Sequence, residues 1–98
     1  MAIEKGSSAA MYNYACMLEK GKGVAINYEE AIQYYKMAIE KCNSSAMNNY
    51  ACMLKNGERI PINYEEAIKY FKMAIEKGDS NAMNKYALML ERGEGIAV

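Results

Sequence analysis

The amino-acid sequence repeats itself with a period of 36 residues. The string Ala-Ile-Glu-Lys begins at Ala2, at Ala38 and again at Ala74. When residues 2–37 are aligned with residues 38–73, 12 of the 36 positions differ and the other 24 are identical. Such self-similarity is typical of solenoids, in which one structural unit buries its faces on its neighbours. We therefore expect residues 1–98 to form a single array with units 2–37, 38–73 and a partial unit 74–98.

Each unit contains the signals of two helices. Ser, Asn and Asp residues precede the first helix of a unit, where their oxygens cap free N–H groups, and a glycine follows its end. Asn27 and Asn63 are good N-caps for the second helix, with Glu30 and Glu66 three residues later in a capping-box arrangement. We call the first helix of each unit helix A and the second helix B. The predicted helices A span 8–20, 44–56 and 80–92, and the predicted helices B span 28–41 and 64–77.

One helix end departs from the repeat. Gly78 closes the helix B of the second unit, but Cys42 stands at the equivalent place in the first. If that site needs a positive φ angle, Cys42 is strained there, because a side chain disfavours the left-handed region.

Apolar residues recur along each helix with a period of 3.6 residues. In the first helix B the apolar stripe comprises Tyr28, Ala31, Ile32, Tyr35, Ala38 and Ile39. Between the helices, the apolar loop residues Val24, Ile26, Ile60 and Ile62 are expected to fill the gap between stacked pairs. The fold class that follows is all-α: an α-solenoid of about two and a half helix-turn-helix units with five helices, which we expect to wind as a right-handed superhelix.

Charge composition argues against two classes of partner. Twelve Lys and Arg residues balance twelve Asp and Glu residues. Nucleic-acid binders neutralise phosphates with clustered basic residues, and the chain has no such cluster. A neutral chain is not drawn to an anionic membrane, and no apolar run approaches the roughly 18 residues that a membrane span requires. We therefore expect neither a nucleic-acid nor a membrane partner.

The three cysteines and the absence of histidine bear on chemistry and location. Cys16, Cys42 and Cys52 make an odd count without paired spacing, which suits a reducing compartment and indicates a cytoplasmic protein. Zinc needs four close N, S or O ligands, so Cys16 and Cys52 are better explained as small buried apolar residues than as metal ligands. No nucleophile elbow or phosphate loop is present either. We expect no enzyme activity, no metal and no cofactor.

The 36-residue unit resembles the Sel-1-like repeat, a member of the tetratricopeptide-like α-solenoid superfamily. The tetratricopeptide repeat itself has a period of 34 residues and a shorter loop. The resemblance rests on Ala10, the run Tyr14 to Leu18, the Gly-x-Gly-Val loop from Gly21 to Val24, Asn27, Tyr28, Ala31, Ile32, Tyr34 to Lys36, and Ala38. It covers essentially the whole chain.

The resemblance implies a role as an adaptor or scaffold that binds other proteins, with helix A lining a concave groove. A cysteine-rich subset of the family has been associated with β-lactam binding, and this gives a minor enzyme alternative. Members of that subset carry two cysteines per repeat. This chain has Ile39 and Met47 near the places where such a pair is expected.

Comparison between the units indicates where a partner would bind. Positions that differ between the units are free of stacking demands, and in helix A they fall on one face of the helix. Asparagine side chains on such a face can both donate to and accept from an extended peptide. The residues proposed to bind a protein or peptide, which we call the ladder residues, are Tyr12, Asn13, Cys16, Glu19, Asn48, Asn49, Cys52, Asn84 and Lys85.

A third hypothesis is self-association. The chain begins with residues that match only the tail of a helix B, and its last helix A has no helix B after it. Solenoids normally end in polar caps, because each unit otherwise exposes an apolar face. We therefore also expect either a fragment of a longer array or a homo-oligomer that pairs through these uncapped ends.

Overall fold

The computed structural model describes residues 7–57 and 60–94, and in that part of the chain it contains five α-helices and no strand. The helices are α1 (Ser8–Lys20), α2 (Tyr28–Glu40), α3 (Ser44–Asn56), α4 (Tyr64–Glu76) and α5 (Ser80–Arg92). All five begin at the predicted residue, and the three helices A also end there. The start of the first predicted unit (residues 2–6) and the end of the third (residues 95–98) lie outside the described residues.

The two helices B end one residue earlier than predicted. Lys41 and Lys77 have left the helix, with φ and ψ of −95° and 17° at Lys41 and of −89° and 1° at Lys77. The N–H of Lys41 donates to the carbonyl of Ala38 at 3.0 Å and the N–H of Cys42 donates to that of Ile39 at 2.8 Å, which tightens the last turn before the chain reverses.

Side chains cap the helix starts as the sequence predicts. Asn27 Oδ1 accepts a hydrogen bond of 3.0 Å from the N–H of Glu30, and Asn27 Nδ2 donates one of 3.2 Å to the Glu30 carboxylate. The backbone N–H of Asn27, which a standard capping box would use, donates instead to the carbonyl of Leu18 at 2.9 Å. Asn63 has the same three bonds, to Glu66 and Leu54. The cap therefore also ties the start of helix B to the end of helix A.

Glycine is required where the helices A end. Gly21 has a φ of 73°, and a Cβ atom there would lie 2.7 Å from Cγ1 of Ile26. Ile26 and Ile62 thus cover the glycine that ends helix A, and each is 54% exposed. The prediction that these two isoleucines fill the gap between stacked pairs is wrong, because the close contact with the glycine holds them at the surface. Val24 and Ile60 do pack against the core.

Cys42 adopts the left-handed conformation that the sequence comparison anticipated. Its φ is 64°, against 84° for the equivalent Gly78, and no other non-glycine residue in the described part has a positive φ. Because a β-carbon disfavours this region, Cys42 carries backbone strain that Gly78 does not.

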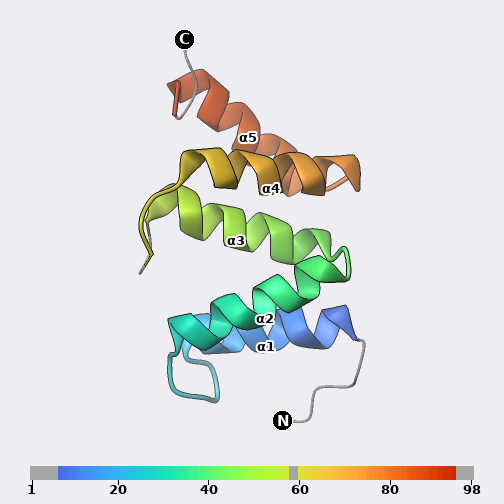
Figure 1. Cartoon of the computed structure of the whole chain (residues 1–98), viewed down its shortest axis with the longest axis vertical. Coiled ribbons are helices and arrows are strands. Elements are labelled where there is room, and N and C mark those ends of the chain that lie inside the picture. The colour runs from blue at the N-terminus through green and yellow to red at the C-terminus, as the bar shows by residue number, and fades with distance from the viewer. Residues whose placement is uncertain (1–6, 58–59, 95–98) are drawn as a thin grey trace.

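The five helices stack in chain order along the longest dimension of the molecule, with α1 and α5 at opposite ends (Figure 1). The principal extents are 45 × 26 × 17 Å. The helices of one unit, α1 with α2 and α3 with α4, pack most extensively, and α2 with α3 and α4 with α5 join successive units. Contacts therefore run between neighbours in sequence, as in an α-solenoid.

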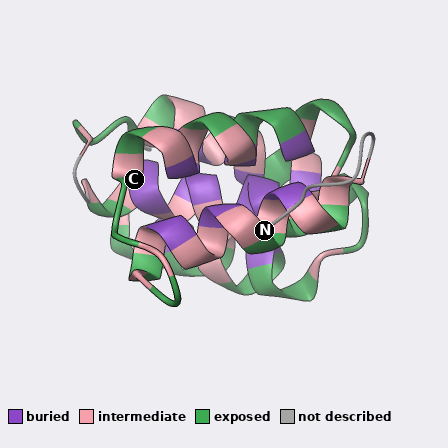
Figure 2. Cartoon of the chain, turned by 90° about the horizontal axis from the view of Figure 1, so that it is seen from below, coloured by how far each residue is buried: buried purple, intermediate pink, exposed green. Residues whose placement is uncertain are grey.

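Buried residues gather on the inner sides of the helices, and exposed residues cover their outer sides (Figure 2). The aromatic rings of Tyr35 and Phe71 are fully buried, each between two alanines on its own helix that are also fully buried. Those alanines are Ala31, Ala38, Ala67 and Ala74. The predicted apolar stripe of helix B is confirmed, and its small residues allow close approach of the neighbouring helices.

Aromatic contacts repeat with the units. Tyr14 meets Tyr34 edge to face at 4.9 Å between ring centroids, and the equivalent Tyr50 and Tyr70 lie 5.3 Å apart. The ammonium group of Lys36 lies 5.6 Å from the ring centroid of Tyr50 in the next unit. The ammonium group of the equivalent Lys72 lies 5.8 Å from the ring centroid of Tyr86, so the same sequence positions make the same contacts within and between units.

Candidate functional site

The structure places the ladder residues at three levels of exposure. Asn13 and Asn84 are exposed, and Asn48 is buried at 7% exposure. The other six are half-buried, namely Tyr12, Cys16, Glu19, Asn49, Cys52 and Lys85. Asn48 is therefore not open to direct contact in this arrangement, whereas the half-buried residues have both a surface and a packed side.

A hydrogen-bonded cluster forms around the hydroxyl of Tyr35, where α1, α2 and α3 meet. Tyr35 Oη donates to Glu19 Oε1 at 2.6 Å, and Asn49 Nδ2 lies 3.3 Å from Tyr35 Oη as a donor. The same Nδ2 group lies 3.4 Å from Tyr12 Oη and 3.5 Å from Cys16 Sγ. We call this cluster of Tyr12, Cys16, Glu19, Tyr35 and Asn49 the first junction. It joins four ladder residues to one residue of helix B.

The environment of the first junction favours the neutral form of its tyrosines. Burial raises the pKa of Tyr35 above the ordinary value for tyrosine, and its hydrogen bonds with Cys16 and Glu19 raise the pKa further. Burial is also the main cause of the raised pKa of Tyr12. Both hydroxyl groups therefore remain protonated hydrogen-bonding groups at neutral pH.

The equivalent positions one repeat later differ in chemistry. Phe71 replaces Tyr35 and removes the hydroxyl, Lys55 replaces Glu19, and Lys85 replaces Asn49. We call the set Asn48, Cys52, Lys55, Phe71 and Lys85 the second junction. Tyr35 was expected only as a core residue, and its polar role was missed. The sequence does carry a signal of this polar role: in the unit where Phe71 replaces Tyr35, Lys55 also replaces Glu19.

A groove of about 270 Å³ lies between the two junctions. It draws residues from three helices A, including Glu19 from α1, Asn49 from α3 and Lys85 from α5. Four ladder residues line it, and four further lining residues were not predicted. The full lining is Glu19, Lys20, Asn49, Cys52, Met53, Lys55, Asn56 and Lys85.

Cations outnumber anions in this groove. Among the described residues that line it, the three lysines Lys20, Lys55 and Lys85 are accompanied by one carboxylate, that of Glu19. Among residues 7–57 and 60–94, the only ion pair joins Arg92 to Glu94, so none of the three lysines has a carboxylate within 4.0 Å. The groove is therefore locally positive in a chain whose formal net charge is zero.

Asn48 adds a buried polar group without a full set of partners. Its Oδ1 atom is buried and has no hydrogen-bond donor. Asn48 lies one helical turn before Cys52, which lines the groove, and hence on the same face of α3. At the equivalent place in the first junction, Tyr12 Oη has Asn49 Nδ2 as a partner.

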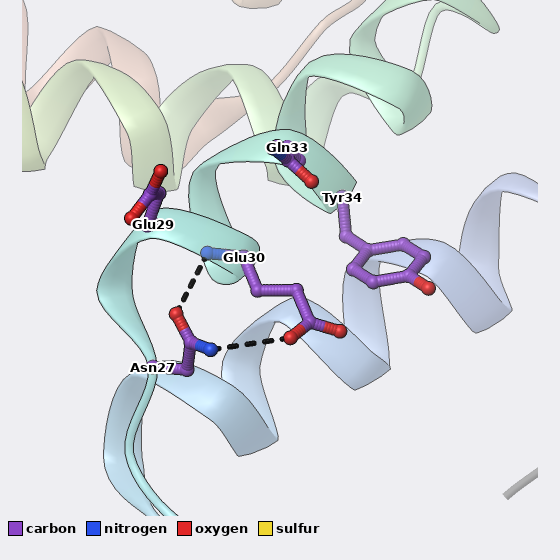
Figure 3. Close-up of a pocket in the computed structure, with 5 residues that line it drawn as sticks. All are labelled: Asn27, Glu29, Glu30, Gln33 and Tyr34. Atoms are coloured by element: carbon purple, nitrogen blue, oxygen red, sulfur yellow. Dashed lines mark hydrogen bonds between the residues drawn. The ribbon is translucent and has the colours of Figure 1, made fainter.

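Two hollows that are more open than the groove lie at the first turns of α2 and α4. The first is lined by Asn27, Glu29, Glu30, Gln33 and Tyr34, and Figure 3 shows Asn27 and Glu30 turned toward each other across it. The second has Asn63, Glu65, Glu66 and Lys69 at the equivalent positions. The acidic residues lie at the positive end of a helix dipole and take part in capping, which accounts for their presence.

Within the described part of the chain, no group of three or more potential ligands is placed to hold a metal ion. In the same part of the chain, none of Cys16, Cys42 and Cys52 takes part in a disulfide. Among residues 7–57 and 60–94, no helix has both the length and the apolar character needed to cross a bilayer.

Comparison with known proteins gives consistent results. The family model described as Sel1 repeat matches residues 8–41, 44–79 and 80–98. A Sel1 repeat protein from Oxalobacter formigenes, known from its crystal structure, is 27% identical with a TM-score of 0.85; the match covers 93% of this chain and 37% of that one. No curated protein matches the sequence significantly.

A second solved structure is that of c5321, described as a protective antigen present in uropathogenic Escherichia coli strains and displaying an SLR fold. It is 24% identical with a TM-score of 0.87, and the match covers 93% of this chain and 20% of that one. At this identity the likeness concerns the fold alone. The chain therefore spans well under two thirds of the length of either protein.

Proposed function

Because the chain belongs to the Sel1 repeat family, whose members are generally protein-interaction modules, we propose that it is a scaffold or adaptor that binds a protein or peptide along its helices A. The ladder residues are the proposed contact residues. Asn13, Asn84 and the half-buried members would contact the partner, and Asn48 would act from beneath them.

The observation that carries this proposal is the groove shared by α1, α3 and α5. Glu19, Asn49 and Lys85 come from three successive helices A and line one continuous depression. An extended segment of about ten residues spans roughly 33 Å, enough to run across three stacked helices. Amide and charged side chains along the way can bond both the N–H and the C=O groups of such a segment.

We propose no catalytic role. The Sel1 repeat fold is typically a non-catalytic scaffold. The three cysteines form no disulfide with one another, so the cysteine-rich, β-lactam-binding alternative receives no support from them. Free thiols fit a reducing compartment, and the cytoplasmic location expected from the cysteine count stays a proposal.

Selection from a random peptide library displayed on phage would test the scaffold role. The test variant carries Asn13→Ala, Asn84→Ala and Lys85→Ala. The matched control carries Gln33→Ala, Glu40→Ala and Glu76→Ala, three exposed residues of the helices B. We expect selected peptides to bind the wild type and the control but not the test variant. Failure to select any peptide, or equal binding to all three proteins, would contradict the proposal.

A specific observation favours a second candidate, self-association through α5. Met83 is 45% exposed, whereas the equivalent Met11 and Met47 are 6% and 1% exposed. Leu90 is 48% exposed, whereas the equivalent Leu18 and Leu54 are 4% and 5% exposed. Helices α2 and α4 pack on α1 and α3, and no described helix packs on α5 in the same way. A second copy could cover this apolar face.

Light scattering over a range of concentrations separates the two candidates. Self-association predicts that the mass rises with concentration and that Met83→Glu with Leu90→Glu returns the chain to a monomer. A chain that stays monomeric at every concentration would rule out the second candidate and leave the first intact.

A further inference from the structure

The two junctions occupy equivalent positions of the repeat, but their polar groups differ in the hydrogen-bond and charge partners that they have. In the first junction the Glu19 carboxylate accepts from Tyr35 Oη at 2.6 Å, and Asn49 Nδ2 has three acceptors within 3.5 Å. The polar side chains of the first junction thus bond one another and need no outside partner.

The second junction lacks that network. Phe71 has no hydroxyl to offer, and the ammonium groups of Lys55 and Lys85 have no carboxylate within 4.0 Å in the described part of the chain. Lys55 and Lys85 are both half-buried, which makes an unneutralised charge more costly than on an open surface. The Oδ1 atom of the buried Asn48 also lacks a donor. Among the described residues, negative charge is therefore what this end of the groove lacks.

The lysines within the helices B, in contrast to those of the groove, each lie beside an aromatic ring. Lys36, Lys69 and Lys72 lie 5.6, 5.4 and 5.8 Å from the ring centroids of Tyr50, Tyr70 and Tyr86. Each of those ammonium groups is thus placed over an aromatic face, which attracts it. Within the described part of the chain, no aromatic ring lies in this way beside the lysines of the groove, and Lys20 is a third cation among the lining residues.

We infer that the groove binds an extended peptide segment by an acidic side chain, which is held between Lys55 and Lys85. This inference rests on the proposed scaffold function and names the chemical class of its partner. A carboxylate there would make charge-assisted hydrogen bonds with both ammonium groups. Nucleic acid fits less well, because three lysines beside the Glu19 carboxylate are too few to follow a phosphate backbone.

Neutral and positive segments are disfavoured by the same geometry. A neutral segment would leave the two lysines uncompensated in a more deeply buried setting, and a basic one would add repulsion. Specificity for acidic segments therefore follows from the second junction, whereas the first junction contributes shape and the Glu19 carboxylate at the other end of the groove.

The test uses three fluorescein-labelled peptide pools of about ten residues, randomised over Gly, Ser, Tyr and Leu, with a fixed central pair of Glu-Glu, Gln-Gln or Lys-Lys. Binding is measured by fluorescence anisotropy at about 50 mM and about 500 mM salt, because screening weakens exposed charge pairs. We expect the Glu-Glu pool to bind roughly tenfold more tightly than the Gln-Gln pool at low salt, as hydrogen bonds to charged groups allow.

The variant pair Lys55→Gln with Lys85→Gln should abolish the preference for the Glu-Glu pool. The matched control, Lys41→Gln with Lys77→Gln, removes the same charge from two exposed residues that follow α2 and α4 and should keep the preference. Circular dichroism confirms that each variant is folded.

The outcomes distinguish the inference from the function on which it rests. Equal binding of the Glu-Glu and Gln-Gln pools, or equal loss of preference in both variant pairs, would overturn the acidic class. If the Gln-Gln pool then still bound in a manner that depends on the ladder residues, the scaffold function would stand. Binding of none of the pools would count against both.

Discussion

The hydroxyl of Tyr35 donates a hydrogen bond of 2.6 Å to the carboxylate of Glu19, from the middle of one helix to the last turn of another. The side chain of Tyr35 is otherwise fully buried. This bond links a core residue to the groove, because it fixes the position of Glu19, which is the only carboxylate among the described residues that line the groove.

Removing that hydroxyl should cost stability. We expect Tyr35→Phe to lower the free energy of unfolding by about 1 kcal/mol at neutral pH, the typical net value of such a bond. Urea denaturation followed by circular dichroism measures the change. Phe71 already occupies the equivalent place, so the ring itself is tolerated. An unchanged unfolding midpoint would show that the bond adds nothing to stability.

Alkaline pH should weaken the fold partly through the same residue. The pKa of Tyr35 is raised above its ordinary value of 10.0 by burial and by hydrogen bonds with Cys16 and Glu19. The folded state therefore favours the protonated phenol, and this contribution is complete below about pH 10 and is lost as the pH rises above it, by up to ~1.4 kcal/mol per pH unit.

Comparison with Tyr35→Phe isolates this contribution, since the raised pKa values of Tyr12, Tyr50 and Tyr70 affect both proteins. We expect the stability advantage of the wild type over the variant to stay constant below about pH 10 and to shrink as the pH rises above it in urea titrations. A constant advantage would mean that Tyr35 does not titrate differently in the folded and unfolded chains.

Relief of the strain at Cys42 should stabilise the protein. Cys42 has a φ of 64° and is exposed, so Cys42→Gly removes an unfavourable conformation without removing a buried contact. We expect a gain of about 1 kcal/mol in unfolding free energy. The reciprocal change Gly78→Ala should cost a similar amount, because no atom lies within 4 Å of the added Cβ and only the backbone is strained. A loss of stability in Cys42→Gly would contradict this explanation.

The buried amide of Asn48 should lower the free energy of unfolding. Its Oδ1 atom is buried without a donor, so Asn48→Leu should raise the unfolding free energy by about 1 kcal/mol. Asn84→Leu, at the equivalent exposed position, serves as the control and should be nearly neutral. Thermal denaturation of the two variants against the wild type measures both effects. Destabilisation by Asn48→Leu alone would show that the amide is better satisfied than its surroundings indicate.

Two leucines at the same place in the repeat should respond differently to truncation. Leu54 is 5% exposed and Leu90 is 48% exposed. We expect Leu54→Ala to cost about 2–4 kcal/mol through lost burial and an unfilled cavity, and Leu90→Ala less than about 1 kcal/mol. Chemical denaturation at low concentration gives both values. Equal costs would indicate that α5 is covered, and a cost at Leu90 that rises with concentration would indicate self-association.

The local features of the fold could be predicted from the sequence. Helix starts at Asn27 and Asn63 depend on a side chain and an N–H three residues away, and the positive φ of Cys42 depends on its place after a helix. These interactions join residues close in sequence, and the 36-residue repeat supplied an internal comparison for each. The single-residue error at the ends of α2 and α4 arose because Lys41 and Lys77 could have continued the helix.

The candidate site could be predicted only in part. Variation between the units pointed to Glu19, Asn49, Cys52 and Lys85, all of which line the groove. The burial of Asn48 and the exposure of Ile26 were not visible, because they depend on which side chains of neighbouring helices meet.

The sequence by itself determined the repeat, the helices and their caps, since these follow from residues within one or two turns of each other. Only the tertiary structure decided that the Tyr35 hydroxyl reaches Glu19 and that three helices A bring unneutralised lysines around one groove. The physical reason is that hydrogen bonding and charge balance between helices depend on side-chain direction and distance in the packed stack. A period of 36 residues shows that positions are equivalent, but it does not show which groups they contact.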